Sequence, residues 1–153
     1  MFMGTLFKKI FIVIPVLLFS FELFSKVHTV KMLNQGPTGV MVFEPAVLKI
    51  NIGDTVTFVA TDAAHNSASI PSMLPPNATA WNGQLSRDIS VTFDIPGIYG
   101  YQCTPHAMMA MVGIIQVGDD SSNLQSVKNS ASQFKTTFVM NQTRLDDYLS
   151  QLN

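Results

Sequence analysis

The chain of 153 residues has the length of a single domain. Only 12% of its residues are charged, about half the share typical of globular proteins, and its formal net charge is −1. This balance argues against a nucleic-acid-binding protein, and the low charge content predicts extensive uncharged surface.

The N-terminal segment has the pattern of a secretory signal peptide. Lys8 and Lys9 precede an apolar run over residues 10–21, which is the order of the positive and apolar regions in such signals. The apolar run is short for a membrane span. We therefore expect cleavage after Ser25, which divides the chain into a signal peptide of residues 1–25 and a mature domain of residues 26–153. An uncleaved membrane anchor is the alternative.

The next part of the chain is predicted to be all-β. Turn-forming residues separate short segments that are rich in β-branched and aromatic residues. A stretch rich in proline and small residues, 69–83, is predicted as a long loop. This arrangement favours an antiparallel sandwich or barrel. The predicted strands cover residues 27–32, 47–52, 55–60, 89–95, 98–103 and 111–117.

From about residue 121 the pattern changes to a helical one. Residues 143–152 place four large side chains on one helical face, which predicts an amphipathic helix; these are Leu145, Tyr148, Leu149 and Leu152. Thr143 and Asp146 are spaced as an N-terminal capping pair. Residues 121–130 are predicted as another short helix. The predicted fold is a β-sandwich with C-terminal α-helices.

Soft metal ligands gather around the single cysteine of the chain. His106 follows Cys103 by three positions, and Met111 begins the next predicted strand. Thiolate and thioether groups favour Cu(I), and imidazole suits both copper oxidation states. Two histidines, one cysteine and a weak methionine describe a blue-copper electron-transfer site. The second histidine must be His28 or His65, and His65 is favoured because it directly follows a predicted strand.

Other interpretations of the same residues remain open. Cys103 taken alone fits a small buried side chain in a structural β-sandwich, and Met108 and Met109 fit core packing equally well. Cys103 and His106 fit a nucleophile and its base in an enzyme. A copper-binding or copper-delivery protein would use similar ligands. A structural zinc site is disfavoured, because the chain lacks the four cysteines or histidines that close such a site.

Two long segments resemble the pseudoazurins, a family of small cupredoxins. They are residues 32–66, with "VMVFEP", and residues 96–119, with "CTPH", and the tail over residues 123–152 is also similar. The resemblance implies a cupredoxin-like Greek-key β-sandwich and a monomeric periplasmic electron carrier that is not an enzyme. It implies a copper nitrite reductase as acceptor and a cytochrome as donor. It also implies one copper ion, Cu(II)/Cu(I), bound by His65, Cys103, His106 and Met111.

Three further residues are expected to tune the copper site. Asn66 is placed to tie the loop of His65 to the loop of Cys103. Pro105 has no backbone N–H and cannot donate a hydrogen bond to the cysteine sulfur, so we expect Pro105→Ala to raise the reduction potential. By resemblance, Met41 lies near the exposed histidine; simple packing is its alternative role.

The surface around the site is predicted to be apolar. Pseudoazurins often carry lysines where this chain has Gln35, Ala63 and Gln102. Residues 63–86 and 95–118 contain no charged side chain. We therefore expect an apolar docking face. The alternative is a basic rim, made by Lys31, Lys49 and Lys128.

Overall fold

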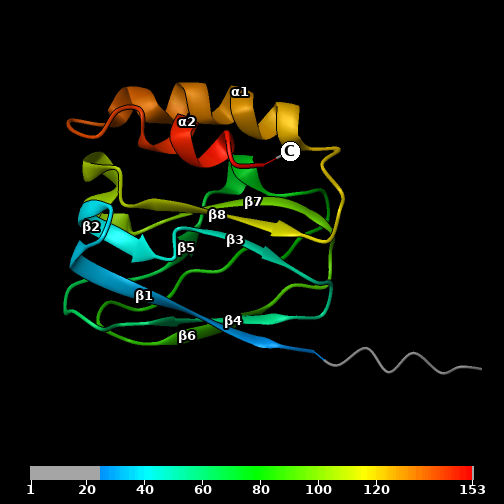
Figure 1. Cartoon of the computed structure of the whole chain (residues 1–153), viewed down its shortest axis with the longest axis horizontal. Coiled ribbons are helices and arrows are strands. Elements are labelled where there is room, and N and C mark those ends of the chain that lie inside the picture. Colours follow the sequence, from blue (N-terminus) through cyan, green and yellow to red (C-terminus); the bar gives the residue numbers. More distant parts are fainter. Residues whose placement is uncertain (1–24, 153) are drawn as a thin grey trace, which may run out of the picture.

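Two four-stranded sheets pack face to face in the computed structural model, which describes residues 25–152. The first sheet has the strand order β2-β1-β4-β6, and the second has the order β3-β8-β7-β5. Figure 1 shows the two sheets as layers, with the C-terminal helices over the second. The strands are β1 (Val27–Gly36), β2 (Gly39–Glu44), β3 (Val47–Ile50), β4 (Thr55–Val59), β5 (Ala68–Ser69), β6 (Ile89–Thr92), β7 (Gly97–Gln102) and β8 (Val112–Val117).

All six predicted strands are present, and the structure adds two. β2 forms a hairpin with β1, and the two-residue β5 pairs with β7. The sequence of β2, GVMVFE, lacks the simple alternation that marks a strand. Its strand is defined by its pairing with the neighbouring β1. The predicted loop over residues 69–83 holds the short 3-10 helix η1 (Pro71–Met73).

The expectation of purely antiparallel sheets is wrong. β1 pairs with β4 in parallel, and so does β3 with β8. Parallel neighbours cannot be joined by a tight hairpin. Here the chain passes to the other sheet between β2 and β3 and returns at β4, so each parallel pair is separated by intervening strands.

An aromatic cluster fills the space between the sheets. The rings of Phe43 and Tyr101 lie 4.8 Å apart at 65°, and those of Phe58 and Tyr101 lie 5.1 Å apart at 63°. Such edge-to-face pairs contribute beyond their buried area. Gly113 lies opposite Tyr101 in the β7–β8 pair, and a Cβ there would come within 2.2 Å of the Tyr101 ring. The glycine therefore leaves room for the tyrosine beside the start of β8.

The predicted C-terminal helices cover the outer face of the second sheet (Figure 1). They are α1 (Leu124–Phe134) and α2 (Arg144–Leu149), with the 3-10 helix η3 (Lys135–Thr137) between them. α1 contacts β7 and α2 contacts β8. All four apolar residues predicted for the inner face of the last helix are buried; they are Leu145, Tyr148, Leu149 and Leu152.

The predicted capping pair of Thr143 and Asp146 is not formed. Thr143 has helical backbone angles (φ −89°, ψ −13°) and makes no capping bond with its side chain. A capping residue needs extended angles to reach the first free N–H groups. The Thr143 hydroxyl instead donates to the Asp147 carboxylate, at 3.1 Å.

The predicted signal peptide lies outside the described residues, apart from its last position, Ser25. Within residues 25–152, no helix combines the length and the apolar character that crossing a membrane requires.

Candidate metal centre

Three of the four predicted ligands converge at one end of the sandwich. His65 lies in the loop after β4, Cys103 directly follows β7, and His106 lies in the 3-10 helix η2 (Thr104–Met109). Their ligand atoms all lie within 4.8 Å of one another, and they are the one such cluster among the described residues. His28 is elsewhere, bonded to Asp54 at 2.8 Å. The structure therefore brings His65, and not His28, to the cysteine.

The two imidazoles and the thiol point toward a common centre. Cys103 Sγ lies 3.6 Å from Nδ1 of His65 and 3.4 Å from Nδ1 of His106. The two Nδ1 atoms are 3.1 Å apart. Each side chain thus presents an atom with a lone pair to the same small space, which is the arrangement that a metal ion needs.

Asn34 determines which nitrogen of His65 is free to bind. Its Oδ1 lies 3.0 Å from Nε2 of His65. Because an amide oxygen only accepts hydrogen bonds, Nε2 carries the proton and Nδ1 keeps its lone pair. Burial, together with the charge of His106, lowers the pKa of His65, and Asp62 only partly opposes this. The imidazole is therefore neutral at neutral pH, as metal binding requires.

The environment of Cys103 suits a metal ligand better than a nucleophile. The side chain is completely buried. Burial raises the pKa of the thiol, while hydrogen bonds from the backbone of Asn66 and His106 partly lower it. A buried thiol with a raised pKa is a weak nucleophile at neutral pH. A bound metal ion would remove its proton outright.

Asn66 joins the loop of His65 to the loop of Cys103. Its Oδ1 accepts a hydrogen bond from the backbone N–H of Thr104, at 2.8 Å, and its Nδ2 donates to the Thr104 hydroxyl, at 3.1 Å. Nδ2 also donates to the carbonyl of Gly83, at 3.0 Å. The ligand spacing therefore rests on a network of side-chain contacts as well as on the strands.

Met111 is the methionine that the fold holds against Cys103. The N–H of Cys103 donates to the Met111 carbonyl at 2.9 Å, and the N–H of Met111 donates to the His106 carbonyl at 3.2 Å. The Met111 side chain is fully buried, whereas Met108 is 57% exposed and Met109 is half-buried. Of the three methionines in this segment, Met111 is buried and tied through its backbone to Cys103 and His106, whereas Met108 is a surface residue.

Pro105 lies between two predicted ligands in the chain, and the role of Met41 beside the site stays a prediction. Pro105 lies in the first turn of η2 and has no backbone N–H, so it adds no donor to those of Asn66 and His106 near Cys103. Met41 is half-buried in β2 and has a positive φ of 49°.

Arg144 in α2 is a supporting residue that the sequence did not indicate. Its side chain is almost fully buried. Nη1 donates to the carbonyls of Met41 (3.0 Å) and Ala110 (3.1 Å), directly before Met111 in the chain. No local pattern marks this role, because the three residues meet only after the helix packs on the sheet.

Exposed apolar side chains lie on the segments near His106. The half-buried His106 lies on the segment that carries Met108, and Val139 donates its N–H to the Met108 carbonyl. Side chains of several large apolar residues are exposed on the segments around the site: Val40, Leu85, Met108, Val139 and Met140.

The basic rim stays an alternative, and its three lysines lie on different elements. Lys31 lies opposite Glu44 in the β1–β2 pair. Lys49 lies opposite Gln116, near the far end of β8, and Lys128 lies on α1. The charged groups that act on His65 are His106 and the acidic Asp62.

The donor set fits a copper ion. It combines two imidazole nitrogens, one sulfur that can ionise and a buried thioether nearby in the chain. This is the ligand chemistry of a blue-copper centre, and it differs from the closed four-ligand sets of structural zinc sites.

Comparisons with known proteins agree with this chemistry. A model of the family described as copper binding proteins, plastocyanin/azurin family, matches residues 30–118. A pseudoazurin from Paracoccus pantotrophus is 39% identical over 130 residues, which cover 85% of this chain and 86% of that protein. A putative pseudoazurin from Rhizobium leguminosarum bv. viciae is 48% identical over 101 residues, covering 66% of each chain. The crystal structure of pseudoazurin from Methylobacterium extorquens AM1 matches with a TM-score of 0.74 at 38% identity, covering 83% of this chain and 99% of that one.

Proposed function

Because the chain belongs to the pseudoazurins, copper-binding electron carriers of the plastocyanin/azurin family, we propose that its copper site lies around Cys103. The observation that carries this proposal is the convergence of three ligand atoms within 4.8 Å. The ligands are the thiolate of Cys103, the imidazoles of His65 and His106, and the thioether of Met111. When bound, copper supplies a one-electron couple between Cu(II) and Cu(I).

The protein groups around this site perform three tasks. Asn34 holds His65 in the tautomer that binds through Nδ1, and Asn66 keeps the two ligand loops at a constant distance. Burial of Cys103 and His65 excludes water from the ligands. His106 reaches the surface among exposed apolar side chains, so it is the point at which a redox partner would contact the site. A site held on strands and by such contacts keeps its geometry when the charge of the metal changes.

The cellular role follows from the family resemblance. We propose a monomer in the periplasm, exported by a signal peptide that is cleaved after Ser25. We propose that it donates electrons to a copper nitrite reductase and receives them from a cytochrome. The uncharged docking face makes apolar contact the main recognition element for these partners.

Two other functions are less well supported. A copper-delivery protein needs ligands that a partner can reach, but Cys103 and His65 are both fully buried. An enzyme that uses Cys103 as nucleophile needs an accessible thiolate, and burial raises the pKa of this thiol. We therefore propose that the protein has no enzymatic activity.

The test is a titration of the mature chain, residues 26–153, with Cu(II), followed by visible absorption. We expect an intense blue band that saturates with a single copper per chain and disappears on reduction. Cys103→Ser should remove the band, and Met108→Leu, the control at an exposed methionine, should retain it. A folded protein without the band would contradict the electron-carrier function and favour a structural thiol.

A further inference from the structure

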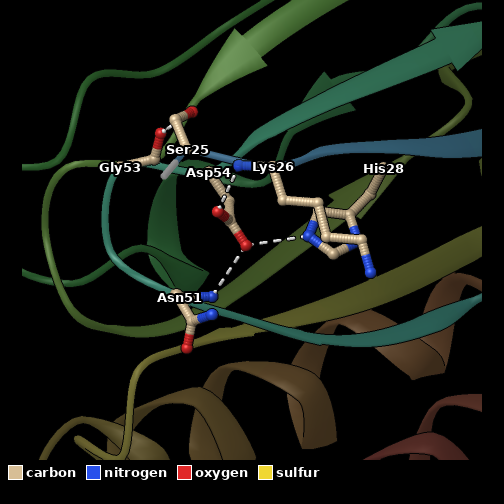
Figure 2. A network of polar contacts seen from close by, with 6 residues as sticks. All are labelled: Ser25, Lys26, His28, Asn51, Gly53 and Asp54. Carbon is tan, nitrogen blue, oxygen red and sulfur yellow. Dashed lines mark hydrogen bonds and ion pairs between the residues drawn. The ribbon is translucent and has the colours of Figure 1, made fainter. Parts of the chain in front are cut away.

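A buried carboxylate lies at the end of the sandwich opposite the metal centre. Asp54 precedes β4, and His65 follows the same strand, so the two residues mark opposite ends of the first sheet (Figure 1). The Asp54 side chain is 1% exposed. Figure 2 shows three nitrogen donors around it. They are the backbone N–H of Lys26 (2.8 Å), the backbone N–H of Asn51 (3.0 Å) and Nε2 of His28 (2.8 Å).

These contacts keep Asp54 ionised. Burial by itself raises the pKa of the carboxyl, but the hydrogen bonds from His28, Lys26 and Asn51 and the charge of His28 outweigh it, so the net pKa lies below its ordinary value. A buried charge is costly unless it has a partner of opposite sign. Two of the three donors are neutral amides, and His28 is a cation only when it is protonated. The three donors therefore stabilise the negative charge of Asp54, but none of them is permanently positive.

Lys26 is the residue through which the first strand is attached to this carboxylate. Its N–H donates to Asp54, and its carbonyl accepts a hydrogen bond from Thr55, at 2.9 Å. The preceding Ser25 is exposed, and its hydroxyl donates to the Gly53 carbonyl, at 2.6 Å. The amide that faces Asp54 is thus the peptide bond between Ser25 and Lys26.

That peptide bond is also the expected cleavage site of the signal peptide. We propose that Asp54 is the binding site for the α-ammonium group that cleavage creates at Lys26. This inference rests on the processing step of the proposed function. Hydrolysis of the Ser25–Lys26 amide adds one water, leaves the carboxylate on Ser25 and converts the neutral Lys26 nitrogen into an ammonium ion.

The new charge would arise at the atom that already contacts Asp54. The bond from the neutral N–H is already strengthened by the ionised Asp54, and an ammonium donor adds the attraction between opposite charges. Removal of Ser25 sacrifices only the exposed hydrogen bond between its hydroxyl and the Gly53 carbonyl, which joins neutral groups. The mature fold is therefore more stable than the precursor fold, because cleavage strengthens a contact that already holds the start of β1 beside β4.

The stabilisation has a definite pH dependence. An α-amino group ordinarily titrates at about 7.7–8.0, and the facing carboxylate raises that pKa in the folded state only. The stabilisation is then complete below about pH 8 and is lost as the pH rises through the raised pKa. The other titratable groups of the site are His28 and Asp54.

The experiment compares two forms of the copper-loaded mature chain, one with a free amine at Lys26 and one with the same amine acetylated. We expect acetylation to increase the unfolding equilibrium constant about fivefold to tenfold near neutral pH. The difference should vanish above about pH 10. It should also vanish in Asp54→Asn, which keeps the shape of the side chain and removes its charge.

Two results would overturn the proposal. One is equal stability of the free and acetylated forms at neutral pH. The other is an exported protein whose mass shows a first residue other than Lys26. If Asp54→Asn does not fold, NMR titration of the α-amine decides: an unshifted pKa in the folded protein contradicts the proposal, and a raised one supports it. The blue band reports on the copper site independently, so it should be the same in both forms.

Discussion

Nε2 of His65 lies 3.0 Å from Oδ1 of Asn34, a residue of the first strand that is 31 positions away in the sequence. Asn34 also donates its backbone N–H to Asp62, at 2.6 Å, so the contact is tied to the loop that carries His65. The arrangement links the orientation of a buried ligand to the last residues of β1, an inner strand of the first sheet.

Replacement of this asparagine should weaken copper binding. Asn34→Ala leaves Nε2 of His65 without its acceptor and allows the ring to turn or to change tautomer. Loss of such a supporting contact typically reduces metal affinity about 10-fold to 100-fold. Competition with a chelator measures the affinity. Gln35→Ala, at the next and exposed position, serves as the control, and equal affinities of the two variants would contradict the role of Asn34.

Pro105→Ala should raise the reduction potential. The alanine supplies a backbone N–H in the first turn of η2, two residues after Cys103. A donor to the cysteine sulfur stabilises the thiolate and reduces its donation to the metal, which favours Cu(I). Voltammetry measures the change. An unchanged potential would show that the new N–H does not reach the sulfur.

Arg144→Met should destabilise the fold, and the half-buried Lys135 provides the matched control. Arg144 is buried and donates to the carbonyls of Met41 and Ala110, which would be left without this donor. Loss of hydrogen bonds to a buried charge costs about 2–4 kcal/mol in the free energy of unfolding. Lys135 pairs with Asp146 at the surface, so Lys135→Met should change the free energy of unfolding by less than about 0.5 kcal/mol. Urea unfolding measures both variants, and similar losses of free energy in the two would contradict the supporting role of Arg144.

Asp54 should contribute to acid denaturation. Its pKa is lower in the folded protein than its ordinary value. A lowered folded pKa means that the stabilisation is complete above the unfolded pKa of about 3.9 and is lost as the pH falls through the folded value. In Asp54→Asn, the free energy of unfolding should therefore decrease less steeply between about pH 5 and pH 2. Unfolding curves with the same acid slope as wild type would exclude Asp54 as the cause.

Electron transfer through the His106 face should depend weakly on salt. The side chains exposed there are apolar, including Met108. Electron self-exchange between oxidised and reduced copies, measured by NMR line broadening, should change less than about threefold between about 0.05 and 0.5 M salt. Met108→Glu should slow the exchange and make it salt-dependent, while Met108→Leu should retain the wild-type behaviour. A steep salt dependence of the wild type would point to a charged face.

Several features of the protein are determined by short stretches of its sequence. Alternating β-branched residues predicted six strands, because alternate side chains of a strand face opposite sides of the sheet. The helical spacing of Leu145, Tyr148, Leu149 and Leu152 predicted a buried face in the same way. Cys103 and His106 lie three residues apart, so one tight turn suffices to bring them together. In each case the interacting groups are neighbours in the chain.

The tertiary structure decided what depends on distant segments. It placed His65 rather than His28 beside Cys103, because β4 and β7 end at the same end of the sandwich although they belong to different sheets. It also made β1 and β4 parallel, set Asn34 against His65 and buried Arg144 against the Ala110 carbonyl. A periodic pattern reports only which face of an element is buried. Which partner covers that face is decided when elements far apart in sequence pack together, and the supporting contacts of the metal site arise at that step.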